Sequence, residues 1–207
     1  MQHLRKAWAN LQKFRDQNEI LKKQLDENRI VFIGDSIIAG WKHHSLFKEN
    51  PHYINRGING QTTSQILRRF KADVIALQPK CVLILVGTND IAENNGPISL
   101  EDIQNNFLSM LEIAKESHLK VVFCSILPAS GYYWNKNILQ PIEKIQALNQ
   151  FLNSLANNSD VFFLDFYAEL VYQNSMAKKY SLDGVHPNVD GYTVMTELLQ
   201  KNQSLNL

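Results

Sequence analysis

Short apolar runs without polar alternation recur along this chain and are separated by segments of helical periodicity. Strands that are apolar on both faces are typical of a parallel sheet covered by helices. Because parallel neighbours need crossover helices, the alternation predicts an α/β fold, a three-layer α/β/α sandwich with five strands. The five runs are Ile30–Gly34, His52–Asn55 (the weakest), Cys81–Val86, Lys120–Ser125 and Val161–Asp165. The helical segments lie near Ser64–Leu77, Leu100–Glu116, Pro141–Asn157 and Val189–Lys201.

Size and charge exclude several classes of protein. A chain of 207 residues with 44% hydrophobic side chains is long enough for one sizeable core. Its 21 Lys and Arg against 20 Asp and Glu leave a net charge of +1, so nothing favours a nucleic-acid partner. No apolar run approaches the ~20 residues that cross a bilayer, so no integral membrane association is expected.

Two features bear on the cellular compartment. The first residues are polar, without the apolar stretch and cleavage site of a secretory leader, which predicts a cytoplasmic protein. A chain from which a leader had been trimmed would have the same sequence. Cys81 and Cys124 lie inside apolar runs and are expected to be free, buried thiols.

Residues 2–28 have the pattern of an amphipathic helix. Its apolar positions are Leu4, Ala7, Leu11, Phe14, Leu21 and Leu25, with Asn18 in the same seam. The repeat is too short for a good coiled coil, so we expect this extension, residues 1–29, to pack on a domain formed by residues 30–207. The alternative is a partner helix, which would make a homo-oligomer.

The first apolar run ends in the turn Gly34-Asp35-Ser36. A serine at the carboxyl end of a buried parallel strand lies where open α/β sheets place their reactive groups. Its hydroxyl is a poor nucleophile unless a base removes the proton. Asp183 and His186 lie three residues apart near the carboxyl terminus, a spacing that lets the carboxylate orient the imidazole. Ser36, His186 and Asp183 could therefore act as nucleophile, base and orienting group.

Acyl transfer also needs donors that face the developing oxyanion. Two segments that follow predicted strands carry such groups, a glycine-rich turn with Gly57 and Gly60, and a turn with Asn89. Ser36 N–H, Gly60 N–H and the Asn89 side-chain amide would form a three-donor oxyanion hole. Gly57 is the rival for the glycine position.

Four ordered blocks of this sequence resemble those of the GDSL or SGNH hydrolases, a superfamily of esterases, lipases, thioesterases and carbohydrate acetylesterases. The blocks are Gly34-Asp35-Ser36, Gly60, Gly87-Thr88-Asn89-Asp90 and Asp183-Gly184-Val185-His186-Pro187. The resemblance covers about Ile30 to Leu199 and implies a flavodoxin-like five-stranded parallel sheet. It implies Ser36 as nucleophile, His186 as base, Asp183 as its partner, and Gly60 with Asn89 as oxyanion donors, with no metal or other cofactor.

The resemblance is strongest to bacterial acylhydrolases and to the acetylhydrolase subunits that act on platelet-activating factor. It implies a serine esterase that forms an acyl-enzyme and removes a short acyl or acetyl group from a carbohydrate or other small alcohol. Two positions depart from the family pattern: Ile38 makes the rim beside Ser36 more apolar, and Gln61 replaces a frequent Asp.

Aromatic residues that follow strands are candidates for a substrate wall. Trp41 lies a few residues beyond Ser36, and Tyr132, Tyr133 and Trp134 lie in the irregular stretch Leu127–Gln140. Because this stretch follows the fourth strand, it should overhang the edge of the sheet that carries Ser36. The alternative is that these rings only pack their own loops.

Other functions stay open at this point. The same residues would serve a lysophospholipase or thioesterase with longer acyl chains, an acyltransferase, or a non-catalytic module that binds acylated glycans. A metal-dependent phosphoesterase would use Asp35, Asn89, Asp90 and His186, although two-metal sites usually have more ligands. We expect Asp35 and Asp90 to hold backbone N–H groups instead.

Overall fold

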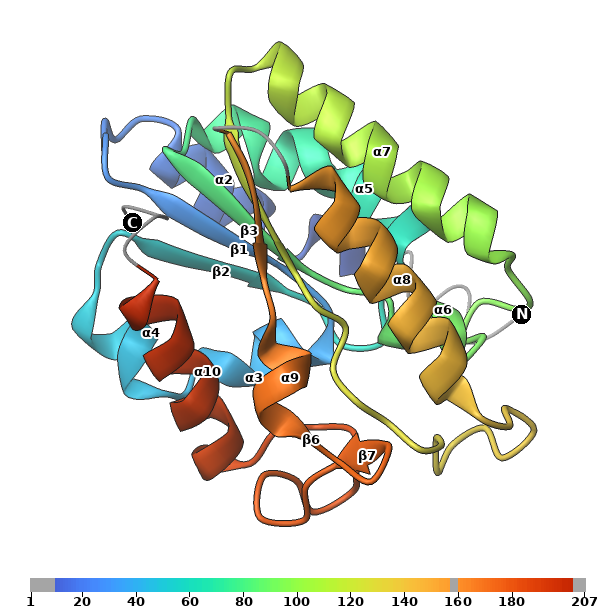
Figure 1. Ribbon diagram of the computed structural model, residues 1–207. Helices are drawn as coiled ribbons and strands as arrows, with labels where there is room; N and C mark the ends of the chain where they lie inside the picture. The colour runs from blue at the N-terminus through green and yellow to red at the C-terminus, as the bar shows by residue number, and fades with distance from the viewer. Residues whose placement is uncertain (1–9, 157–159, 203–207) are drawn as a thin grey trace.

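The protein is built on one five-stranded parallel sheet with the strand order β2-β1-β3-β4-β5 (Figure 1). A computed structural model describes residues 10–156 and 160–202. The strands are β1 (Ile30–Gly34), β2 (Tyr53–Gly57), β3 (Cys81–Leu85), β4 (Lys120–Cys124) and β5 (Val161–Leu164). The strand order reverses at β1, so the crevice beyond its carboxyl end is where α/β sheets of this flavodoxin-like order bind ligands. The predicted fold class is confirmed.

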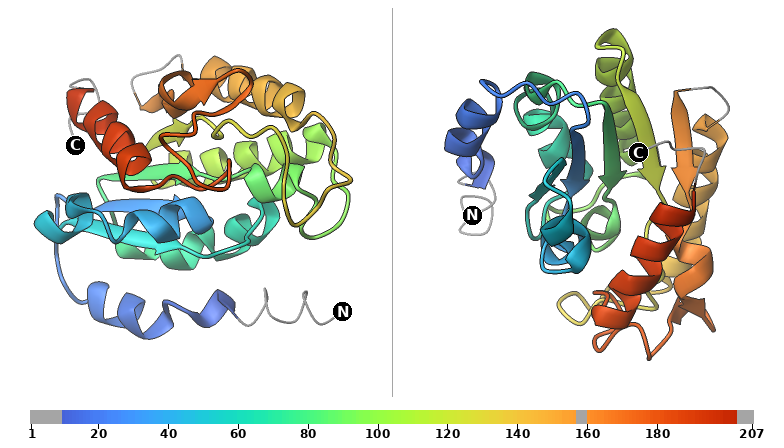
Figure 2. Two further views of the ribbon diagram at one scale, coloured as in Figure 1. Left: turned by 90° about the horizontal axis from the view of Figure 1, so that it is seen from below. Right: turned by 90° about the vertical axis from the view of Figure 1, so that its left-hand side faces the viewer.

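Helices cover both faces of the sheet (Figures 1 and 2). Alternate residues of β1 enter different cores: Val31 and Ile33 pack with one layer of helices, and Ile30 and Phe32 pack with the other. The first layer consists of α5 (Thr63–Asp73), α7 (Leu100–Glu116) and α8 (Pro141–Leu155). The second consists of α3 (Ser36–Trp41), α4 (Ser45–Glu49), α9 (Phe166–Leu170) and α10 (Val189–Lys201). Shorter elements are η2 (Ile75–Leu77), α6 (Thr88–Ile91), β6 (Val171–Tyr172) and β7 (Ser175–Met176).

Several element boundaries differ from the sequence prediction by a few residues. The second strand is Tyr53–Gly57 rather than His52–Asn55, because β2 pairs with β1 from Ile30↔Tyr53 to Gly34↔Gly57. Polar residues at its end obscured this strand in the sequence. The helix predicted over Ser64–Leu77 ends at Asp73 and is followed by a separate 3₁₀ turn.

The amino-terminal helix ends earlier than predicted, at Leu21. Its described part consists of a 3₁₀ turn, η1 (Asn10–Gln12), and α2 (Arg15–Leu21), while Leu4 and Ala7 lie outside the described residues. Arg29 donates to the carbonyl oxygens of Leu21 and Gln24, so the chain turns toward β1 and Leu25 is left 94% exposed. Helical periodicity cannot anticipate such an arginine, which comes from the following segment.

Asn18 fixes α2 to the rest of the described chain. Its side-chain amide donates to Asp73 Oδ1 over 2.6 Å and to the Ala72 carbonyl over 3.2 Å. Its oxygen accepts from Nε and Nη2 of Arg56. The polar residue that interrupted the apolar seam is therefore buried, and it holds α2 beside α5 and the edge strand β2.

Other expectations from composition concern the thiols and the membrane. Cys81 and Cys124 are free and buried, as predicted. No helix in the described part of the chain combines the length and apolarity needed to cross a membrane.

Candidate active site

Ser36 begins α3 directly after β1, at the carboxyl edge of the sheet (Figure 1). The preceding residue, Asp35, caps this helix: its carboxylate accepts a hydrogen bond from the Ile37 N–H over 2.9 Å. The cap holds the turn in which Ser36 stands. Ser36 Oγ lies 2.9 Å from Nε2 of His186, a residue 150 positions further along the chain.

His186 lies in a tight turn that Asp183 organises. The carboxylate oxygen Oδ2 of Asp183 lies 2.7 Å from His186 Nδ1. The other oxygen, Oδ1, accepts from the N–H groups of Val185 and His186 and from the Ser181 hydroxyl. The three-residue spacing therefore does what the sequence predicted: one carboxylate closes the turn and orients the ring, leaving Nε2 toward Ser36.

The charge of Asp183 is set by this turn. Partial burial opposes ionisation, but hydrogen bonds from the backbone and side chain of His186 and from Val185 N–H outweigh it and lower the pKa of Asp183 to about 2. The carboxylate is therefore ionised at any pH at which the imidazole is a useful base. An ionised neighbour favours the imidazolium that forms when His186 takes a proton.

Ser36, Gly60, Asn89 and His186 line one hollow of about 710 Å³. Gly60 has φ +76°, a backbone conformation that suits glycine, and open space surrounds its Cα. The rival, Gly57, ends β2, and a Cβ there would lie 2.1 Å from the backbone nitrogen of Ala39. Gly57 is thus a packing position between β2 and α3, whereas Gly60 is exposed to the hollow.

The side-chain amide of Asn89 is held from both ends. Its nitrogen donates to Asp35 Oδ2 and to the Gln61 carbonyl, each over 3.1 Å. Its oxygen accepts from Asn94 Nδ2 over 2.6 Å, and the Asn94 oxygen accepts from Trp134 Nε1 over 2.8 Å. An indole nitrogen can only donate and the Gln61 carbonyl can only accept, so the groups at the two ends of this chain of contacts fix the direction of both amides. The Asn89 nitrogen consequently faces Asp35 and the Gly60 turn.

Arg69 of α5 joins the segments that carry the site. Its guanidinium donates to Gln61 Oε1 over 2.7 Å and to the carbonyl oxygens of Gly34 and Arg56. It also forms an ion pair with Asp73 over 2.9 Å, and both side chains are buried. A planar cation with five donors therefore fixes the ends of β1 and β2 and the turn after Gly60 relative to one another.

Asp35 and Asp90 are buried and hydrogen-bonded, as predicted. Both oxygens of Asp90 accept from Thr63 N–H, and Oδ1 also accepts from the Thr63 hydroxyl. These contacts leave neither carboxylate free to bind a metal together with His186. In residues 10–156 and 160–202, no three His, Cys, Asp or Glu side chains are grouped as metal ligands would be.

Burial raises the pKa of both carboxyls. The pKa of Asp35 is raised to about 6. Burial and the nearby charge of Asp35 raise the pKa of Asp90 to about 7, against the opposing hydrogen bonds from Thr63. Each group therefore binds a proton more tightly in the folded chain than in the unfolded one.

This difference predicts a pH-dependent stability. A raised carboxyl pKa means that the folded state holds more protons between about pH 4 and pH 7, so the free energy of unfolding falls as pH rises through that window. Asp183 is ionised in both states above pH 5 and adds no slope there. We expect Tm to fall from pH 5 to pH 8, and to fall less steeply in Asp90→Asn. Each change of about 1 kcal/mol moves Tm by about 2–4 °C. Parallel Tm curves for the two proteins would contradict the assignment.

Two of the four aromatic residues predicted to line the site do not do so. Trp41 is fully buried beneath α10, where its Nε1 donates to Thr196 Oγ1 and its ring contacts Phe32 and Phe166. Its position on α3 turns the ring into the core. Tyr132 is 3% exposed and packs against Trp134. These two predictions were wrong because residue type and chain position do not indicate which face of a short element points inward.

The other two aromatic residues do line the hollow that contains Ser36. Tyr133 is exposed, and Trp134 is partly exposed with its ring centroid 6.2 Å from that of His186. Sequence reasoning missed Asn94 and Arg69, which hold the site from outside the four blocks. The only signal was the unusual run of amides at residues 94 and 95, and nothing distinguished Arg69 from its neighbour.

Comparison with known proteins agrees with the three-layer α/β/α fold and its flavodoxin-like sheet. The model of the GDSL-like lipase/acylhydrolase family matches residues 32–194. The chain belongs to this family, and the predicted resemblance is confirmed.

One solved structure and two sequence relatives are similar to this chain over most of its length. The solved structure of a GDSL-like lipase from Bacteroides thetaiotaomicron has a TM-score of 0.90 and 37% identity, covering 96% of this chain and 99% of that one. Platelet-activating factor acetylhydrolase IB subunit alpha2 from Rattus norvegicus is 25% identical over 183 residues, 84% of this chain and 76% of that protein. Thioesterase 1/protease 1/lysophospholipase L1 from Escherichia coli is 24% identical over 182 residues, 83% and 81% of the two chains.

Proposed function

We propose that this protein is a serine esterase that hydrolyses carboxylic esters through an acyl-enzyme on Ser36. The observation that carries the proposal is the line of contacts from Ser36 Oγ through His186 to Asp183, with distances of 2.9 and 2.7 Å. A hydroxyl, a base and an ionised orienting carboxylate in this order are the parts that activate a serine.

The reaction follows from that order. His186 Nε2 takes the Ser36 proton as Oγ attacks the ester carbonyl, and Asp183 stabilises the imidazolium. The tetrahedral intermediate collapses when His186 returns the proton to the alcohol oxygen, and the alcohol leaves. Water then attacks the acyl-enzyme with the same base and frees Ser36.

The oxyanion is proposed to bind the N–H groups of Ser36 and Gly60 and the amide of Asn89. In the free protein, both N–H bonds of that amide are directed at Asp35 and at the Gln61 carbonyl. The substrate oxygen therefore has to compete for one of them. A pre-oriented donor that exchanges one acceptor for another costs less reorganisation than one recruited from water.

A short acyl group on a carbohydrate or other small alcohol suits the hollow around Ser36. Six of its thirteen lining residues are asparagines, and its larger apolar side chains are Tyr133 and Trp134. Such a surface can hydrogen-bond hydroxyl groups but offers little cover for a long acyl chain. The acetyl group in the name of the rat relative agrees with this choice, while the Escherichia coli thioesterase/lysophospholipase represents the long-chain alternative.

The choice between the two is tested with p-nitrophenyl esters from acetate to palmitate. We expect kcat/KM to rise no further beyond butyrate, because methylenes that stay in water add no binding free energy. Each buried methylene would otherwise contribute about 0.8 kcal/mol. Measurements below the critical micelle concentration keep the long esters comparable. A rise toward palmitate would contradict the short-acyl specificity while leaving the esterase activity in place.

A further inference from the structure

A second hollow, of about 420 Å³, meets the first at Ser36, Asn59 and His186 and extends toward the amino-terminal segment. Lys13, which lies between η1 and α2, and Lys42, at the end of α3, both line it. None of the described residues that line it is Asp or Glu. The surface that continues from the proposed nucleophile is therefore cationic.

Lys13 is held near this surface. Its ammonium contacts the Gly57 carbonyl over 3.4 Å and lies 5.2 Å from the centre of the Phe14 ring. Burial, followed by the charges of Lys42 and Arg69, lowers the pKa of Lys13. In the part of the chain that the structure describes, no carboxylate forms an ion pair with Lys13 or Lys42. The like charges therefore face one another without a counter-charge.

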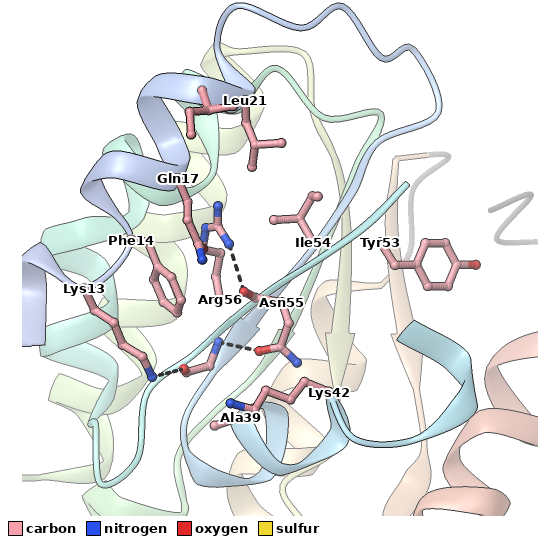
Figure 3. Close-up of a pocket in the computed structure, with 12 residues that line it drawn as sticks. Lys13, Phe14, Gln17, Leu21, Ala39, Lys42, Tyr53, Ile54, Asn55 and Arg56 are labelled. Carbon is pink, nitrogen blue, oxygen red and sulfur yellow. Dashed lines mark hydrogen bonds between the residues drawn. The ribbon is translucent and has the colours of Figure 1, made fainter. Parts of the chain in front are cut away.

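The same two lysines also border a neighbouring hollow of about 510 Å³ between α2 and the edge strand β2 (Figure 3). Arg56 lines that space too, with its guanidinium satisfied by the neutral side chain of Asn18 and the carbonyl of Asn55. Lys13 and Lys42 thus line both hollows and Arg56 lines one of them, without an acid among the described lining residues. Clefts that are lined by one sign of charge concentrate the opposite charge.

The proton transfer of the proposed reaction decides which part of a substrate would lie here. His186 gives its proton to the leaving alcohol, so that alcohol must lie on the His186 side of the ester. The cationic hollow is lined by His186 and Pro187 but by neither Gly60 nor Asn89, the proposed oxyanion donors. It therefore suits the alcohol part of the ester rather than the carbonyl oxygen.

We propose that Lys13 and Lys42 form a subsite for an anionic group, such as a phosphate, sulfate or carboxylate, on the alcohol part of the substrate. The subsite rests on the proposed esterase function and narrows it to acyl esters of negatively charged alcohols. Lysine binds such groups as a point charge, which tolerates different anion shapes. The amino-terminal extension would then take part in choosing the substrate.

The test compares charged and neutral esters that share a reacting group. One pair is 3-acetoxybenzoate and its methyl ester, and the other is the acetyl ester of glycerol 3-phosphate and acetylglycerol. At low salt we expect the intact protein to favour the anionic member of at least one pair by about fivefold in kcat/KM, the size that two solvent-exposed ion pairs supply. A preference in only one pair would identify the carboxylate or the phosphate as the group that is bound. The Lys13→Gln/Lys42→Gln variant should lose the preference through KM while hydrolysing the neutral esters normally.

The matched control is Lys80→Gln/Lys115→Gln, which removes the same charge at the amino-terminal edge of the sheet. Lys80 directly precedes β3, and Lys115 lies at the end of α7. It should retain the preference, and added salt should weaken the preference in the intact protein. Equal ratios of charged to neutral kcat/KM in all three proteins would overturn the subsite. Absence of turnover on the neutral esters in the intact protein would instead contradict the esterase function itself.

Discussion

Replacing Ser36 with alanine is expected to lower kcat/KM for p-nitrophenyl acetate by about 10⁴- to 10⁶-fold, the range found when a serine nucleophile is removed from its triad. Without Oγ, no acyl-enzyme can form, and His186 can only assist direct attack by water. Among the described residues, the side-chain hydrogen bond that this substitution removes is the one from Ser36 Oγ to His186 Nε2, over 2.9 Å. The fold should therefore be unaffected, and Tm should stay within a few degrees of the original.

Two further variants make this result specific. Ser154→Ala changes a serine on the exposed surface of α8 and should leave turnover unchanged. The double variant Ser36→Ala/His186→Ala should be scarcely slower than Ser36→Ala, because groups that act as one unit lose their effect together. Fluorophosphonate should label the original protein and not Ser36→Ala. If Ser36→Ala kept more than a tenth of the original activity, the acyl-enzyme mechanism would be wrong.

Much of the fold was predictable because it depends on patterns that are local in the sequence. Apolar runs identified β1, β3, β4 and β5, since a strand covered on both faces has no polar side to show. The second strand was the weakest prediction because Asn55 and Arg56 lie at its end. Both are satisfied by contacts from other segments, including Ile38 and Asn18, which no local pattern contains.

The candidate site, too, was predictable only where it depends on local sequence. Ser36, Asp183 and His186 were recognisable because strand ends and a tight turn of fixed spacing bring them together. Trp41 was placed wrongly because the inward face of α3 is decided by its packing on α10, far away in the sequence. Similarly, the direction of the Asn89 amide is decided by the Gln61 carbonyl and, through Asn94, by Trp134, in contacts that spacing alone does not reveal.

That chain of amides predicts a large effect from a substitution that touches none of the reacting atoms. In Asn94→Asp, the carboxylate can still accept from Trp134 but cannot donate to Asn89 Oδ1. Two acceptors then face each other and repel. The Asn89 amide cannot turn over to relieve this, because its oxygen would then face Asp35 and the Gln61 carbonyl, so we expect the amide to shift out of line with the proposed oxyanion hole. Losing one oxyanion donor typically costs about 10²–10³ in kcat, so we expect kcat for p-nitrophenyl acetate to fall by about 10²-fold with little change in KM.

Asn95→Asp is the control for the added charge, because Asn95 lines the same hollow but donates to Thr62 instead of to Asn89. If kcat falls equally in both variants, the cause is the negative charge and the orienting role of Asn94 is wrong. Trp134→Phe keeps an aromatic ring but removes the N–H that holds the Asn94 end of these contacts, so its kcat should fall between those of the original protein and Asn94→Asp. A loss confined to KM in Trp134→Phe would mean that the ring only contacts substrate. A loss in kcat would mean that the aromatic loop aligns the oxyanion donor, since an indole N–H can only donate and cannot be replaced by the Phe ring.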